Sequence, residues 1–273
     1  MEDLTFVDEL KQSPIDIPRA ALRFARAIAY PDLDIAHYLA RLDWLAGMAS
    51  KVLHPNKPVP VQAEALADFL FRQFGFQGNT TDYLDPRNSY INEVLDRRLG
   101  IPISLSVIYV SVAQRLGLPA QGVGLPGHFI VSIQASEGDL YLDPFHGGRR
   151  LSLEDCANLV ILTTGYSGSF QMEWLDPTPP ADILVRMLNN LKNVYMTKED
   201  WDRTLTVLEH IRLVQPERPE NLRDLGLVYH RMNSLRLAVQ LYEQYLTKAP
   251  DAVDAGDIRK SLQEAAKRLA QLN

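Results

Sequence analysis

The stretch NSYINEVLDRRLGIPISLSVIYVSVAQRLGLP, residues 88–119, decides how this chain folds. Within it, apolar residues recur at spacings of three and four from Ile101 to Leu116, which predicts a helix. Pro102 suits the first turn of that helix, and Gly117 follows the last turn as a stop signal. The stretch therefore predicts a helix at the centre of the chain.

On both sides of this helix the pattern changes. The segment before it, GFQGNTTDYLDPRNS at 75–89, is rich in turn formers and predicts a surface loop or the rim of a site. Residues 4–76 repeat apolar positions at helical spacing and are divided by prolines, which predicts several helices. After Gly117, HFIVSIQ at 128–134 and LYLDPF at 140–145 flank the turn formers EGD, so a β-hairpin is expected.

The C-terminal third contains a helical repeat. With Pro219 as position 1 of a 34-residue unit, small, aromatic and proline residues fall where the tetratricopeptide pattern requires them. Those residues are Leu225, Gly226, Tyr229, Ala238, Tyr242 and Pro250. A weaker copy precedes it, and the proline-rich stretch WLDPTPPAD at 174–182 is the best domain boundary. We therefore expect a domain at 1–180 and repeats with a final capping helix at 181–273.

Composition narrows the class of protein. The chain has 273 residues, 46% of them hydrophobic, and a net charge of −6, which is typical of a globular protein and unlike a basic nucleic-acid-binding surface. Its sequence offers neither a membrane-spanning run nor a secretory signal at the N-terminus. Cys156 is the single cysteine, which fits a reducing compartment. The expectations are a cytoplasmic protein with no nucleic-acid partner and no membrane association.

The predicted hairpin contains the residues that could take part in catalysis. Adjacent antiparallel strands would bring His128 close to Asp143, and an imidazole held by a carboxylate is the base half of a nucleophilic triad. The missing member is a nucleophile at the start of a helix, where backbone N–H groups stabilise a thiolate. Asp143, which precedes a proline, also fits a simple Asx turn.

The central stretch, together with PGHFIVSI at 126–133 and YLDPFHGG at 141–148, resembles the bacterial SirB-type family. Members of that family join a transglutaminase-like core to C-terminal tetratricopeptide repeats. The resemblance implies an α+β fold, in which N-terminal helices and a papain-like or transglutaminase-like core with a small antiparallel sheet precede an all-α repeat block. It also implies that catalytically competent relatives of this core place a Cys at the start of the central helix, a His on the next strand and an Asp on the one after.

His128 and Asp143 match the last two of these positions, whereas the window Pro102–Ser104 contains no Cys. A serine needs its proton removed during attack by a well-aligned His, so Ser104 or Ser106 is a weaker nucleophile than a preformed thiolate. We therefore expect a non-catalytic protein that binds a protein or peptide partner through its repeats. The alternative is a hydrolase or acyltransferase acting on amide or ester bonds, with Ser104, His128 and Asp143 as its triad; Ser104 also fits a helix start with no catalytic contact.

Further residues complete the expected site. The polar segment before the central helix predicts a cleft lining made of Asn88, Ser89, Asn92 and Glu93, with His146 beside it, although Asn88 or Ser89 also fits a helix cap. A third alternative is a small-molecule or metal binder that uses His128, Asp143 and His146, since two His and one carboxylate form open metal sites. The chain shows no ligand spacing of the HExxH kind, so the leading prediction is no metal and no cofactor. Cys156 is expected to be a small buried hydrophobe.

Overall fold

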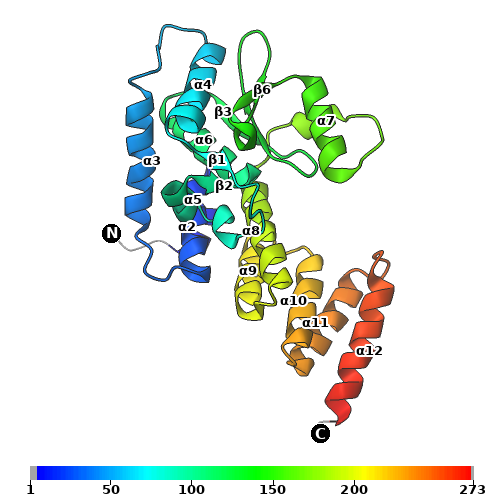
Figure 1. Cartoon of the computed structure of the whole chain (residues 1–273). Helices are drawn as coiled ribbons and strands as arrows, with labels where there is room; N and C mark the ends of the chain where they lie inside the picture. The colour runs from blue at the N-terminus through cyan, green and yellow to red at the C-terminus, as the bar shows by residue number, and fades with distance from the viewer. Residues whose placement is uncertain (1–4, 272–273) are drawn as a thin grey trace. The chain divides into compact units, whose positions relative to one another are not determined.

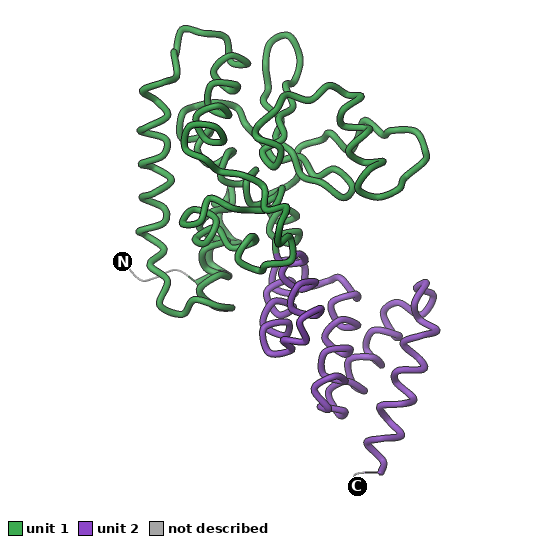
Figure 2. The backbone as a smooth tube through the Cα atoms, viewed as in Figure 1, with its two compact units in different colours: residues 1–187 green, residues 188–273 purple. Residues whose placement is uncertain are grey.

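The computed structural model describes residues 5–271 and divides the chain into two compact units (Figure 2). Unit 1 ends at Met187 and unit 2 begins at Leu188. The division falls inside one helix, α8 (Pro180–Thr197), whereas the proline-rich stretch predicts a boundary after residue 180. Within the described residues, no helix is long and apolar enough to cross a membrane.

Unit 1 begins with a run of helices, as the spacing of apolar residues predicts. The helix starts are set by side chains: Asp16 and Asp34 accept hydrogen bonds from backbone N–H groups one turn into α2 and α3. The helices are α1 (Phe6–Leu10), α2 (Ile17–Ile28), α3 (Ile35–Ala49), α4 (Val59–Ala67), α5 (Ile91–Arg97), α6 (Pro102–Arg115) and α7 (Leu153–Thr164). A turn of π-helix continues α4 from Asp68 to Gln73.

The helix α6 is the centre of unit 1 (Figure 1). Every residue from Pro102 to Ala113 is buried, because α6 packs against α2, α3, α4 and the sheet. The hydroxyl of Tyr109, the tyrosine of α6, donates a hydrogen bond to the Ala63 carbonyl at 2.8 Å, so this buried group has a partner. The chain enters α6 from a short parallel pair, β1 (Gln77–Gly78) with β2 (Leu99–Gly100).

A four-stranded antiparallel sheet follows α6, and its strands lie in sequence order. The strands are β3 (Ala120–Val123), β4 (Ile130–Ile133), β5 (Leu140–Asp143) and β6 (Arg149–Leu151). The predicted hairpin is β4–β5, with Val131 opposite Leu142. The α+β class and the transglutaminase-like core with its small antiparallel sheet are thereby confirmed.

Unit 2 contains the C-terminal part of α8 and four further helices. They are α9 (Trp201–Val214), α10 (Glu220–Arg231), α11 (Leu235–Lys248) and α12 (Ala255–Gln271). The repeat pattern has a direct physical basis: Gly226 of α10 lies against the ring of Tyr242 on α11, which is fully buried. Ala238 and Tyr245 complete this small core together with Ile258 of α12.

We expect Gly226→Ala to lower the free energy of unfolding of unit 2 by about 1–2 kcal/mol. An added Cβ would lie 2.7 Å from a Tyr242 ring carbon, and that clash outweighs the gain in helix propensity. Gly256→Ala is the matched control, because nothing lies within 4 Å of its added Cβ. Urea denaturation should show a loss for the first variant and a gain of up to about 1 kcal/mol for the second; equal effects would contradict this account of the packing.

Candidate functional site

The hairpin brings His128 and Asp143 together. Asp143 is the last residue of β5, and His128 lies just before β4, so both are at the same end of the hairpin. His128 Nε2 lies 3.1 Å from Asp143 Oδ1, and both residues are buried. Gly127 makes the turn that presents His128: its φ is +71°, and an added Cβ would lie 2.4 Å from Thr163 Oγ1. Only glycine satisfies both conditions.

His146 contacts the second oxygen of the same carboxylate. After β5 the chain turns through a short 3₁₀ segment, Pro144–His146, in which Asp143 Oδ1 accepts the backbone N–H groups of Phe145 and His146. The His146 ring returns to Asp143, with Nδ1 2.6 Å from Oδ2, and it stacks on the His128 ring at 5.7 Å between centroids. Asp143 thus makes the expected Asx-type turn and also contacts two imidazoles.

These contacts determine the charge state of Asp143. Burial by itself would raise the pKa of this carboxyl group, but hydrogen bonds and charge from His128 and His146 outweigh burial and hold the pKa below its usual value. Asp143 is therefore a carboxylate at neutral pH, with all of its contacts supplied by donors. His128 Nδ1 makes no hydrogen bond within residues 5–271, so this nitrogen is the chemically available one.

Ser104 makes a different set of contacts. It is the third residue of α6 and fully buried, and its hydroxyl donates to the Asn88 carbonyl at 2.6 Å. The same oxygen accepts the Ile101 N–H at 3.1 Å. Within the described residues no hydrogen bond joins Ser104 to His128. The hydroxyl thus ties the start of α6 to the loop before α5.

The start of α6, where the resemblance predicts the Cys of catalytic relatives, contains no Cys in this chain. Pro102 is the first residue of α6, where a proline completes the helix start without losing a hydrogen bond. The single thiol, Cys156, lies in α7 inside a hydrophobic cluster with Val123, Ile130 and Leu159. Burial raises its pKa to about 11, so this thiol is protonated at neutral pH.

Most of the polar residues predicted to line a cleft are buried in the structure. Asn88 is fully buried and links two parts of the loop: its side-chain amide donates to the Asp82 carbonyl, and its Oδ1 accepts from Asn79. Ser89 and Asn92 are also buried, and only Glu93 of the four is partly exposed. Of the described residues, Asn92 is one of a few whose side chain has a buried polar atom with no partner.

Three residues that the sequence did not single out surround the His128 site. The Phe145 ring lies edge-on to His128, with 6.1 Å between ring centroids, and the half-exposed Tyr83 packs edge-on against Phe145. The guanidinium of Arg186 donates to the His128 carbonyl at 2.8 Å and to the Leu125 carbonyl at 3.1 Å. The one signal for Arg186 in the sequence is a lone cation in the apolar run ILVRML.

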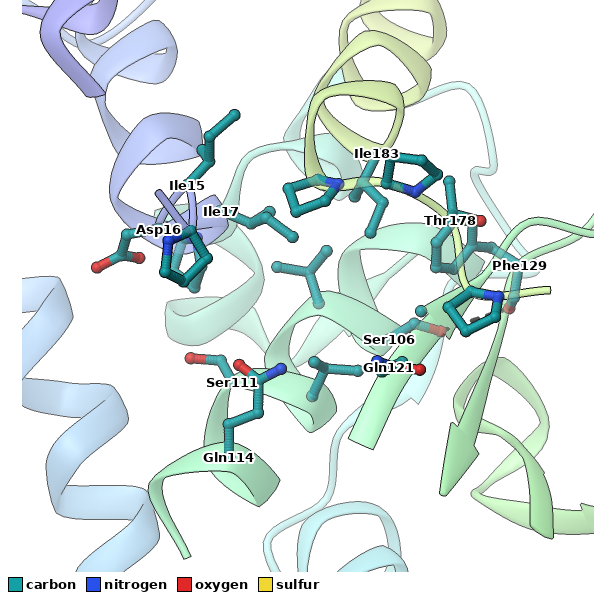
Figure 3. A pocket seen from close by; sticks show the side chains of 18 of the residues that line it. Ile15, Asp16, Ile17, Ser106, Ser111, Gln114, Gln121, Phe129, Thr178 and Ile183 are labelled. Atoms are coloured by element: carbon teal, nitrogen blue, oxygen red, sulfur yellow. Dashed lines mark hydrogen bonds between the residues drawn. The ribbon is translucent and has the colours of Figure 1, made fainter. Parts of the chain in front are cut away.

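Unit 1 also contains a separate cavity of about 520 Å³ (Figure 3). Ile15 and Ile17 lie on one side of it, and Ile183 lies with Phe129 on the other. Ser106, Ser111, Gln114, Gln121 and Thr178 supply polar groups to the lining. The lining includes none of Ser104, His128 and Asp143, so the predicted triad is not built around this space.

Comparison with known proteins supports the same division of the chain. A model of the transglutaminase-like superfamily matches residues 36–189, and a tetratricopeptide repeat model matches residues 191–263. A protein of Xylella fastidiosa named UPF0162 protein is 40% identical over 223 residues, which cover 78% of this chain and 79% of that protein. Human F-box only protein 21 is 37% identical over 127 residues, 44% of this chain and 20% of that protein.

Among solved structures, the crystal structure of menin aligns with 95% of this chain and 73% of that chain, at 12% identity and a TM-score of 0.43. A similarity of this size has no bearing on function. The family matches extend over both compact units and agree with the SirB-type motifs around the central helix and the hairpin. This chain therefore belongs to the transglutaminase-like superfamily and, within it, to the SirB-type family of tetratricopeptide repeat proteins named UPF0162.

Proposed function

We propose that this protein is a non-catalytic member of the transglutaminase-like superfamily that binds a protein or peptide partner through its repeat unit. The observation that carries the proposal is the start of α6. The window Pro102–Ser104, where the resemblance places the thiol of catalytic relatives, contains no Cys, and the Ser104 hydroxyl already donates to a backbone carbonyl. The base half of a triad is kept without a group for it to activate.

A serine mechanism would have to break existing contacts first. The Ser104 hydroxyl would leave the Asn88 carbonyl and the Ile101 N–H, both buried, and each lost hydrogen bond costs about 1 kcal/mol or more. It would also have to reach His128 Nδ1, because Nε2 is held by Asp143. These requirements favour the non-catalytic function over the hydrolase.

The repeat unit supports the binding role. Tetratricopeptide repeats generally mediate contacts between proteins, and their stacked helices form extended surfaces. In unit 2, a chain of ion pairs links α8, α10 and the residue before α12: Lys192 to Asp224, Arg223 to Asp224, and Arg223 to Asp254. Arg223 is therefore already paired, Asn221 is buried with its amide on the Gln215 carbonyl, and Tyr229 packs in the hydrophobic core. Tests of binding are better made at exposed positions.

We expect purified wild-type protein to form no covalent adduct at Ser104 with a fluorophosphonate probe, because the hydroxyl is buried and hydrogen-bonded. Mass spectrometry of the digested protein after incubation checks this directly, with a known serine hydrolase as the positive control. An adduct that maps to Ser104 and disappears in His128→Ala would overturn the non-catalytic assignment and establish the hydrolase. Mapping the adduct avoids reliance on Ser104→Ala, which removes a structural hydrogen bond.

The binding role is tested with a partner captured by in-cell cross-linking and then purified. Affinity for that partner is compared between wild type and two double variants. One carries Glu220→Lys and Arg231→Glu on α10, and the other carries Arg236→Glu and Gln240→Lys on α11; all four positions are exposed. Weaker partner binding by either double variant would locate the docking surface in the repeats. If both sets bind as the wild type does, the repeats are not the docking surface.

The cytoplasm is the compartment that we propose for this function. The support is the single, buried Cys156. A chain with one cysteine forms no internal disulfide, so an oxidising compartment would not stabilise its fold.

A further inference from the structure

We infer that His128, Asp143 and His146 form a binding site for a divalent transition-metal ion of the Zn²⁺ type. The three side chains come from one end of the β4–β5 hairpin and the 3₁₀ segment that follows it. One ligand atom from each of them lies within 4.8 Å of the other two. Two imidazoles and one carboxylate are a recurring ligand set for zinc and non-haem iron.

The orientation of the rings supports this assignment. His128 Nε2 and His146 Nδ1 each point to a different oxygen of the Asp143 carboxylate, at 3.1 and 2.6 Å. The two rings are stacked with only 28° between their planes, so their nitrogens approach the carboxylate side by side. The nitrogens that face the carboxylate are the ones that would bind the ion. The other ring nitrogen of each imidazole would take the outer hydrogen bond that holds a metal-bound imidazole in place.

The distances allow a single ion after a small movement. An ion held at about 2.1 Å by each ligand keeps any two ligand atoms no more than about 4.2 Å apart. Closing from 4.8 Å therefore takes a shift on the order of 1 Å. His146 can supply it, because its side chain is 46% exposed, whereas His128 and Asp143 are buried and fixed.

The chemistry of the ligands selects the kind of ion. Imidazole nitrogen favours zinc, iron, copper and nickel, whereas Mg²⁺ and Ca²⁺ require oxygen ligands. Asp143 contacts both rings through its two oxygens and supplies the carboxylate ligand. Binding requires the lone pairs of His128 Nε2 and His146 Nδ1 to face the ion, so the ring proton sits on the other nitrogen of each ring: Nδ1 of His128 and Nε2 of His146. His128 Nδ1 has no hydrogen-bond partner among residues 5–271 that would oppose this tautomer.

This inference also accounts for residues that the proposed function leaves without a role. Under the proposed function His128 and Asp143 have no nucleophile to activate, yet both are buried and paired. The third residue, His146, belongs to no triad; as a metal ligand it has a defined task. Because the ion is bound by unit 1 and the partner by the repeats, the two proposals fail separately.

The test is isothermal titration of the tag-free, chelator-treated full chain with ZnCl₂, together with the visible absorption of its Co²⁺ complex. We expect one ion per chain with a Kd in the micromolar range or below, no binding of MgCl₂, and a loss of at least about 30-fold in His146→Ala. His146 is partly exposed, so this variant should fold. His54→Ala is the matched control, since His54 is an exposed histidine elsewhere in unit 1 and should leave the affinity unchanged.

Three results would overturn the inference. They are an absence of saturable Zn²⁺ binding below about 1 mM, an unchanged affinity in His146→Ala, and a loss in His54→Ala equal to that in His146→Ala. The covalent-probe and partner experiments are run in EDTA. Their outcome therefore remains informative about the proposed function whether or not Zn²⁺ binds.

Discussion

Asp143→Ala is expected to lower the free energy of unfolding of unit 1 by about 3 kcal/mol. Asp143 is fully buried and accepts hydrogen bonds from two imidazoles and from the backbone N–H groups of Phe145 and His146. Removing it leaves the buried His128 and these N–H groups without their acceptor. Urea denaturation of the full chain measures the loss.

The control for this variant is Asp139→Ala, a carboxylate exposed in the turn of the same hairpin, for which a change within about 0.5 kcal/mol is expected. A loss in Asp143→Ala no larger than in Asp139→Ala would show that the carboxylate does not organise the site.

The difference between wild type and Asp143→Ala should also depend on pH. The folded protein holds the pKa of Asp143 below its ordinary value of 3.8, so the unfolded state binds this proton more readily. The stabilisation is therefore fully present above about pH 4 and is lost as the pH falls through the folded pKa. Unfolding free energies measured at pH 7 and near pH 3 should show the gap between the two proteins narrowing at the lower pH; a gap that widens would contradict the sign of the pKa shift.

Arg186→Ala is expected to lower the free energy of unfolding of unit 1 by about 2–3 kcal/mol and to disturb the His128 site. Burial lowers the pKa of this guanidinium, which nevertheless remains charged and donates to the carbonyls of His128 and Leu125. It also lies over the Phe129 ring at 5.2 Å. The variant leaves both carbonyls short of a donor and opens a gap beside the strand that follows His128.

Two further variants make the Arg186 experiment specific. Arg186→Lys keeps the charge but loses the planar guanidinium over the Phe129 ring, so it should recover only part of the stability. Arg212→Ala removes an exposed cation and should change little. Urea denaturation gives the stabilities, and the NMR signals of the His128 ring report on the site. A His128 signal that does not shift in Arg186→Ala would rule out a positioning role for the guanidinium.

Local patterns were enough to predict most of the fold. The helix at 102–115 and the β4–β5 hairpin follow from apolar spacing and turn formers, which act over a few residues. The repeat follows from Gly226 and Tyr242, because a fixed spacing of small and large residues describes one packing contact that recurs. The nearness of His128 to Asp143 follows from the hairpin, since a tight turn pairs neighbouring strands.

What the sequence by itself determined about this protein is its family, its order of elements and the missing thiol, because each depends on residue types at short, fixed spacings. Only the tertiary structure decided where the polar side chains point. Ser104 donates to the Asn88 carbonyl, the side chains of Asn88 and Asn92 are buried, and the His146 ring contacts the carboxylate of Asp143. Arg186 reaches His128 from 58 residues away along the chain. The physical reason is that a hydrogen-bonding side chain takes the partner that folding brings within about 3 Å, and distant segments supply that partner.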